Sequence, residues 1–195
     1  MKLTTISKKH INTMKNKIKI AALMLALAGT SVVAAEITMV GGEGMFPSKD
    51  IIDNAVKSKD HTTLVAAVKA AGLVETLKGP GPFTVFAPTN SAFSALPEGT
   101  VENLLKPESK EALVKILTYH VVPGKLEFSD LAKEIKSGGG KAKLKTVAGE
   151  TLTATMNGQH NITLRDSKGG VADISTYDVV QSNGVIHVID KVLIP

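Results

Sequence analysis

Histidines are the side chains in this sequence most able to do chemistry, and their spacing gives no metal site. The five are His10, His61, His120, His160 and His187. No two stand four residues apart, the spacing that places a pair of zinc ligands on one face of a helix. The chain also lacks cysteine, which excludes disulfides, thiolate ligands and haem attachment. We therefore predict no metal and no cofactor.

Nucleophilic catalysis is not indicated either. Ser91 lies in Thr-Asn-Ser-Ala-Phe, without the Gly-x-Ser-x-Gly turn that exposes a catalytic serine between a strand and a helix. The glycine run at residues 138–140 lacks the Lys-Ser or Lys-Thr pair of a phosphate-binding loop. A nucleophile needs a base within hydrogen-bond reach, and no motif here places one. We predict that the protein is not an enzyme.

Local structure explains the remaining polar candidates. Asn90 stands before residues 91–96 and is placed to accept a hydrogen bond from a free amide of a first helical turn. Tyr119 and His120 end an amphipathic segment over residues 110–119, where a histidine can bond the last helical carbonyls. His187 alternates with apolar residues, which favours a hydrogen-bonded core or edge position. Partner contact is the open alternative for Asn90, Tyr119 and His120.

The elements that must position these residues follow a leader of different character. Residues 1–35 contain six lysines and no acidic residue, then an apolar run from Ile20 to Ala28 and a small-residue stretch ending at Ala35. This order predicts a secretory signal peptide cut after Ala35, with Met14 as an alternative start. An uncleaved anchor is the alternative, but the run is shorter than the roughly 20 residues that span a bilayer. We expect a secreted or periplasmic protein with no transmembrane segment after cleavage.

Removing the leader changes the charge argument. The full sequence has 23 basic and 18 acidic residues, a net charge of +5. With the six leader lysines gone, residues 36–195 keep 17 basic and 18 acidic side chains, a net charge of −1. The excess of basic residues is thus confined to the predicted signal peptide, and nucleic-acid binding by the mature region is not predicted.

The mature region is predicted to be one α+β domain over residues 48–195, preceded by a flexible lead-in over 36–47. Helical spacing and caps indicate short helices in the first part, over 49–57, 64–71, 91–96, 100–106, 110–119 and 129–135. Strand alternation appears at 83–86 and dominates the last third, over 142–147, 151–156, 161–165, 171–174, 178–180 and 185–189. Asn157-Gly158 predicts a hairpin between two of these runs. Helices first and strands later favour an antiparallel sheet over a doubly wound one.

Three segments resemble the fasciclin (FAS1) family, in the order in which the family has them. They are the Phe83–Leu96 block, the Leu117–Gly124 block with its Tyr-His pair, and the Ser182–Pro195 block. The similarity covers about residues 50–195 and suggests a bacterial, exported, single-domain member. It implies a wedge-shaped β-sandwich of about seven strands with several short helices packed on it.

The resemblance also implies contact residues. The family's Tyr-His segment is proposed as a partner surface, which here points to Tyr119, His120, Val121, Val122 and Pro123, with the adjoining Thr89 and Asn90. In some animal members an Asp-Ile pair is proposed to engage integrins. The matching positions here are Asp178 and Val179, with different neighbours.

These observations predict a non-catalytic adhesion or protein-interaction module. Its partner would be another protein, a cell surface or a matrix polymer, and weak self-association stays open. The alternative is a periplasmic carrier of a small molecule or lipid in an apolar groove between sheet and helices.

Overall fold

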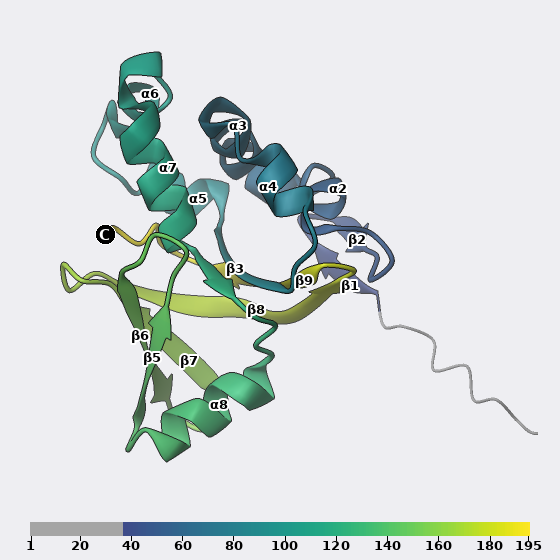
Figure 1. The fold of residues 1–195 in the computed structure, drawn as a ribbon, viewed down its shortest axis with the longest axis vertical. Coiled ribbons are helices and arrows are strands. Elements are labelled where there is room, and N and C mark those ends of the chain that lie inside the picture. The colour runs from purple at the N-terminus through teal and green to yellow at the C-terminus, as the bar shows by residue number, and fades with distance from the viewer. Residues whose placement is uncertain (1–36) are drawn as a thin grey trace, which may run out of the picture. The chain divides into compact units, whose positions relative to one another are not determined.

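A seven-stranded sheet organises residues 37–195, the part of the chain that the computed structural model describes (Figure 1). The predicted leader lies outside the described residues. The sheet order is β4-β3-β9-β8-β7-β6-β5. Its strands are β3 (Phe83–Pro88), β4 (Val121–Pro123), β5 (Lys141–Lys145), β6 (Thr151–Asn157), β7 (Asn161–Arg165), β8 (Val171–Gln181) and β9 (Gly184–Ile189). The predicted α+β class is confirmed.

The strand pairing differs from the prediction at one place. Five of the six neighbouring pairs are antiparallel, but β3 and β9 run parallel, with Phe83 opposite Gly184 and Pro88 opposite Ile189. Parallel neighbours need a long connection, and here almost one hundred residues of helix and sheet separate the two strands. Such a pairing leaves no local turn signal in the sequence.

The long strand β8 bends the sheet into a wedge. Its first residues pair with β7, and the stretch from Ile174 onward pairs with β9, with two irregularities between Ile174 and Val179. The two short strands expected at 171–174 and 178–180 are therefore one bent strand. Beyond β5 the chain returns to β4, where the Val147 amide donates to the Val121 carbonyl at 2.8 Å. This hydrogen bond links the chain beyond β5 to β4, the strand at the other edge of the sheet, in agreement with the predicted wedge shape.

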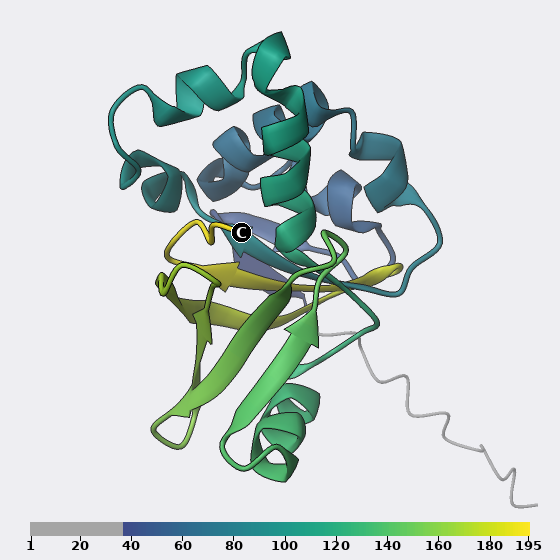
Figure 2. The same cartoon turned by 60° about the vertical axis from the view of Figure 1, so that its left-hand side comes forward.

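Helices cover one side of β3 and β9, and α8 lies alone at the opposite end of the molecule (Figures 1 and 2). The predicted segments are found with small shifts at their ends. The helices are α2 (Ile51–Ala55), α3 (Thr62–Ala71), α4 (Val74–Lys78), α5 (Asn90–Ser94), α6 (Thr100–Leu104), α7 (Lys110–Tyr119) and α8 (Phe128–Ser137), with 3-10 turns η1 (Lys59–His61) and η2 (Pro107–Ser109).

The predicted flexible lead-in is wrong for most of its length. Residues Thr38–Val40 (β1) and Glu43–Met45 (β2) form a hairpin whose Val40 and Met45 are buried among the helices. Strands of three residues are too short to show alternation in the sequence. The turn between them is Gly41-Gly42, with φ of 60° and 78°, a conformation that glycine adopts without strain.

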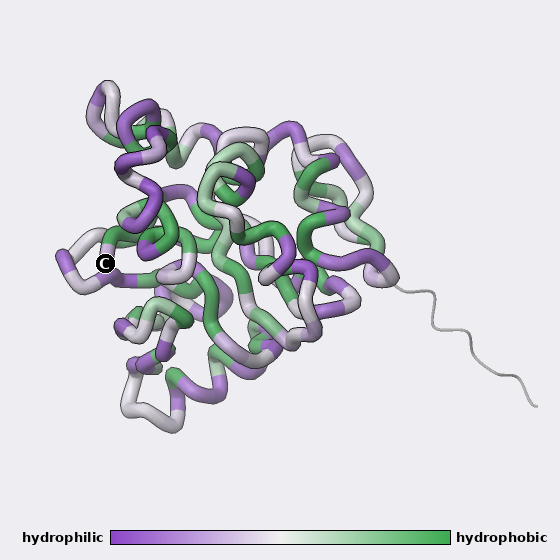
Figure 3. The backbone as a smooth tube through the Cα atoms, turned by 45° about the horizontal axis from the view of Figure 1, so that its top comes forward, coloured by the Kyte–Doolittle hydropathy of each residue, from purple (hydrophilic) through white to green (hydrophobic). Residues whose placement is uncertain are grey.

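Two hydrophobic cores lie on the two faces of β3 and β9. The helix-side core packs Val85, Ala87, Ile186 and Val188 against the helices. The second core, which we name the wedge core, lies inside the bent sheet on the opposite face and includes Phe86 and Ile189. Leu131 and Ile135 of α8 pack against it. Figure 3 shows hydrophobic stretches running through the middle of the molecule.

Candidate functional site

Tyr119 and His120 lie at the junction of α7 and β4, and both are buried. The two residues are 0% and 3% exposed. The Leu193 amide donates to His120 Nε2 at 3.0 Å, so the ring proton is on Nδ1, which donates to the Ile116 carbonyl at 2.8 Å. Burial lowers the pKa of His120 to about 4, against the opposing effects of the Ile116 carbonyl and Asp166. His120 is thus a neutral bridge between α7 and the C-terminal segment.

The Tyr119 hydroxyl also serves the fold. It donates to the Thr151 carbonyl at 3.3 Å and accepts from the Ser167 amide at 3.1 Å, joining α7 to the first residue of β6 and to the turn after β7. Val121 and Val122 are buried in the two cores, and of the predicted segment 119–123 only Pro123 is exposed. The structure therefore does not offer these four buried side chains to a partner.

Thr89 and Asn90 act at the start of two helices. Thr89, not Asn90, caps α5, since its hydroxyl accepts from the Ala92 amide at 3.2 Å. Asn90 Oδ1 instead accepts from the Thr63 amide at 3.0 Å, and Asn90 Nδ2 donates to the Lys59 carbonyl at 2.8 Å. The predicted capping of the helix over 91–96 by Asn90 is therefore wrong, because its side chain accepts from an amide in the first turn of α3 instead. Asn90 ties η1 and α3 to α5.

Asp178 lies where β8 bends, with a φ of 54°, unusual for a residue other than glycine. Its carboxylate accepts from the Phe128 amide at 2.7 Å, at the first residue of α8. Its own amide donates to His187 Nδ1 at 3.3 Å, so the proton of His187 is on Nε2, which donates to the Leu126 carbonyl at 2.8 Å. Burial lowers the pKa of His187 as well. His187 faces the wedge core together with Ile189, as the alternation predicts.

The predicted contact residues do not form one surface. Pro123 pairs with Phe83 at the start of β3, whereas Thr89 follows the end of that strand. At about 3.3 Å per strand residue, roughly 20 Å separates the two. Thr89, Asn90, Pro123 and Asp178 keep partial or full exposure; Thr89 and Asn90 are adjacent, and Pro123 lies at the other end of β3.

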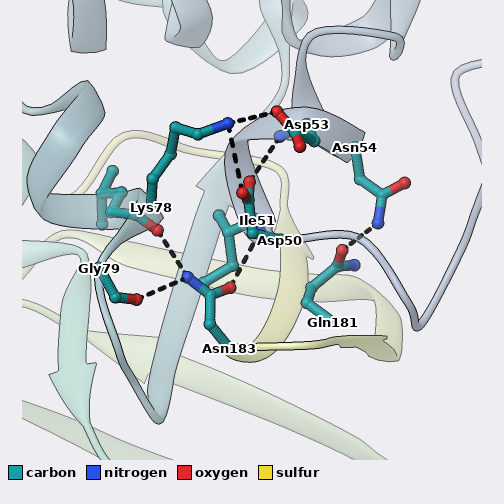
Figure 4. Close-up of polar contacts among 9 residues, drawn as sticks. Asp50, Ile51, Asp53, Asn54, Lys78, Gly79, Gln181 and Asn183 are labelled. Atoms are coloured by element: carbon teal, nitrogen blue, oxygen red, sulfur yellow. Dashed lines mark hydrogen bonds and ion pairs between the residues drawn. The ribbon is translucent and has the colours of Figure 1, made fainter.

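A largely buried amide network, which sequence reasoning missed, joins the turn between β8 and β9 to the helices (Figure 4). Asn183 Oδ1 accepts from the Ile51 amide at 3.0 Å. Asn183 Nδ2 donates to the carbonyls of Leu77 and Gly79 at 2.8 and 3.1 Å. Nearby, Asn54 Nδ2 donates to the Gln181 side chain and to the Phe46 carbonyl. The only signal for Asn183 was its place in the Ser182–Pro195 block.

An apolar cavity of about 90 Å³ lies between the sheet and the helices, bordered by Val40, Met45, Leu64, Val68, Leu73 and Ile186. Among the polar residues that also line it, Ser58 and His61 are 3% exposed each. His61 Nδ1 lies 2.8 Å from Ser58 Oγ, while His61 Nε2 has no hydrogen-bond partner within residues 37–195. Burial lowers the pKa of His61, opposed by the nearby Ala87 carbonyl and by Asp60.

Among residues 37–195, no group of three or more His, Asp and Glu side chains could hold a metal ion. No helix in that part of the chain is long and apolar enough to cross a membrane.

The fold, the bent strand and the signature blocks together define a FAS1 domain. The chain belongs to the fasciclin family, whose domain model matches residues 59–195. The solved structure of a FAS1 domain pair from the insect cell adhesion molecule fasciclin I superimposes with a TM-score of 0.67 at 18% identity, covering 75% of this chain and 51% of that one.

Two curated relatives extend this assignment. Protein sll1483 of Synechocystis sp. is 52% identical over 147 residues, which is 74% of this chain and 73% of that protein. The pig (Sus scrofa) transforming growth factor-beta-induced protein ig-h3 is 38% identical over 152 residues, which is 76% of this chain but 20% of that protein.

Proposed function

We propose that this chain is an exported, non-catalytic adhesion or interaction module that binds another protein, a cell surface or a matrix polymer. The observation that carries the proposal is membership of a family known in adhesion proteins, with the same fold as a domain pair of the cell adhesion molecule fasciclin I. The structure of the buried histidines supports it. Both ring nitrogens of His120 and of His187 are engaged by backbone groups, which assigns these side chains to the scaffold.

A binding assay on the producing cell tests this proposal. Protein expressed from the full sequence is coupled to beads, and the beads are mixed with intact cells and with envelope fragments. We expect retention above that of beads carrying a protein of matched size and charge. Equal retention would overturn the binding function.

A mass measurement on the extracytoplasmic fraction tests export separately. A chain that begins at Glu36 is expected, because Val33 and Ala35 suit the −3 and −1 positions of the cut. Recovery of the chain only in the cytoplasm, with its leader intact, would contradict the export part of the proposal.

The cavity supports a second function, the carriage of a small apolar molecule. Its size of about 90 Å³ is below that of an engineered cavity of about 150 Å³ that takes up benzene, so a small molecule fits better than a lipid chain. The unpartnered His61 Nε2 would pair with a hydroxyl, which can either donate or accept.

Native mass spectrometry of protein from its own cell tests carriage, because a carrier is expected to retain a ligand. A thermal-shift series with 2-propanol and 2-chloropropane then tests the role of His61. Stabilisation by 2-propanol above 2-chloropropane, lost in His61→Phe and kept in the exposed control His160→Phe, would support the site. No shift with either compound, and no retained mass, would exclude it.

A further inference from the structure

One face of the sheet gathers cations and threonines in rows. The residues of β5, β6 and β7 alternate, with Ala142, Leu144, Leu152, Ala154, Ile162 and Leu164 in the wedge core. The other side of the same strands faces outward and carries what we name the basic threonine face, made of Lys141, Lys143, Lys145, Thr151, Thr153, Thr155, Thr163 and Arg165. In Figure 2 β5 and β6 lie side by side with no helix in front of them.

Strand register places these residues in ordered rows. Lys143 is opposite Thr153, which is opposite Arg165. Lys141 is opposite Thr155, which is opposite Thr163, and Lys145 is opposite Thr151. Lysines two residues apart on β5 lie about 7 Å apart at their backbones, and Lys143 is about 10 Å from Arg165 across two strands. The face therefore carries a row of three lysines along β5 and one arginine on β7, with the threonine hydroxyls of β6 between them.

The positive charge of this face is not neutralised within the described domain. None of its four cations forms an ion pair within 4.0 Å with another residue of the 37–195 region. The nearby Glu150 is paired with Lys115 at 2.7 Å. Asp173, opposite Thr163 on the neighbouring strand β8, accepts a hydrogen bond from that threonine. Because residues 36–195 carry a net charge of −1, four unpaired cations on one face are a local concentration and not a general property.

Protection of a sheet edge explains only part of this arrangement. β5 is an edge strand, and lysines on an edge strand discourage pairing with another molecule. Arg165 and the threonines, however, lie on β6 and β7 inside the sheet, where no edge needs protection. The edge role therefore does not account for the rows.

We propose that the basic threonine face binds an acidic polysaccharide, a polymer that presents carboxylates at intervals between hydroxyls. The cations would pair with the carboxylates, and the threonines would exchange hydrogen bonds with sugar hydroxyls. A membrane is a poorer match, because the outward positions of β5, β6 and β7 hold no large apolar side chain that could insert between lipids. This inference rests on the proposed binding function and names its partner class.

The test measures binding to soluble alginate, with dextran as the neutral comparison, in calcium-free buffer. The face variant K141Q/K143Q/K145Q/R165Q removes the four charges and keeps polar side chains. The control variant K57Q/K69Q/K106Q/K110Q removes four exposed lysines from the helix side. We expect the face variant to bind alginate at least tenfold more weakly, the control to change less than threefold, and the wild-type affinity to fall with salt.

Several outcomes would overturn the inference. The face variant and the control variant could lose alginate affinity equally, or the wild-type protein could bind dextran as well as alginate. The wild-type protein could also bind phosphatidylglycerol vesicles more strongly than alginate. Finally, the face variant could self-associate while its alginate binding stays intact, which would leave the lysines only a role in protecting the sheet edge. The bead assay on envelope fragments separates this failure from failure of the binding function. Retention on the beads could be abolished by protease treatment of the fragments and unaffected by added alginate. This result would support the binding function and overturn only the proposal that the partner is a polysaccharide.

Discussion

The two hydrophobic cores of this domain differ in how completely their side chains fill the space between the elements. The wedge core is built from regular strands whose inward side chains, such as Leu152, Leu164 and Ile189, are 0% exposed. The helix-side core is assembled from short helices, a small hairpin and two strands, and it keeps a cavity of about 90 Å³ and the unpartnered His61 Nε2. Alternation in paired strands places every second side chain by local rules, whereas short helices depend on distant tethers for their positions.

The difference has a consequence for where function can lie. Above the wedge core, strand register fixes which outward residues of the basic threonine face are neighbours. The helix-side core is held by single polar side chains, among which Asn90 and Asn183 reach across the chain. Several residues that looked like contact groups in the sequence, such as Asn90, Tyr119 and Asp178, form hydrogen bonds between distant segments of the fold.

Truncating a core leucine should show the largest contrast between the regions. We expect Leu164→Ala in the wedge core to lower the free energy of unfolding by about 4 kcal/mol, and Leu64→Ala beside the cavity by about 2.5 kcal/mol. Leu64 is already 8% exposed and borders empty space, so its removal loses fewer contacts. Urea unfolding measures both losses, and equal losses would contradict the proposed difference in packing.

Acidification should destabilise the protein through His120. Its pKa is about 4 in the folded state and about 6.5 when unfolded, so the unfolded chain binds the extra proton first. Stability contributed by the neutral ring is fully present above pH 6.5 and is lost as the pH falls towards 4, by about 3 kcal/mol in all. The pKa values of His61 and His187 are lowered too, and add to the same trend.

His120→Gln isolates this contribution, since an amide can still donate to Ile116 and accept from Leu193. The variant should lose less stability than wild type between pH 6.5 and pH 4, measured by urea unfolding at each pH. His160→Gln, in an exposed turn, should follow the wild-type curve. An unchanged slope in His120→Gln would show that the ring is not neutral in the folded protein.

A change at Asn183 should loosen the helix side and leave the wedge core folded. Asn183→Asp cannot donate to the Leu77 and Gly79 carbonyls, and we expect a loss of about 2–3 kcal/mol. Hydrogen exchange should quicken in α2 and α4 but not in β6 and β7. Asn157→Asp in the exposed hairpin turn is the control and should change stability by less than about 0.5 kcal/mol. Faster exchange throughout the domain would show that the two regions unfold as one.

Sequence reasoning succeeded where the determinants are local. The alternation over 151–156 and 161–165 and the turn at Asn157-Gly158 predict the β6–β7 hairpin, whose register places Asn157 opposite Asn161. The helix over 110–119 is also found as predicted. In both cases neighbours within one element contain the whole signal.

It failed where a residue's partner lies far along the chain. Asn183 and Ile51 are 132 residues apart, and Asn90 bonds an amide 27 residues earlier, so neither pairing leaves a mark on local sequence. The parallel pairing of β3 with β9, the β1–β2 hairpin and the cavity have the same origin, because each depends on how distant elements meet. The basic threonine face could be predicted only in part. The sequence shows the alternation of its residues along each strand, but only the pairing of β5, β6 and β7 places Arg165 in one row with Lys143.

The smallest expected effect is a difference in sign: the same substitution should change the free energy of unfolding in opposite directions in the two cores. Val68 borders the cavity and is 6% exposed, while Val122 lies in the wedge core and is 4% exposed. Adding one methylene with Val68→Ile should fill empty space and raise the free energy of unfolding by about 0.5 kcal/mol. The same addition with Val122→Ile should crowd a filled core and lower it by about 1 kcal/mol. Thermal unfolding resolves the two signs. If both variants lost stability, the helix-side core would be as fully packed as the wedge core.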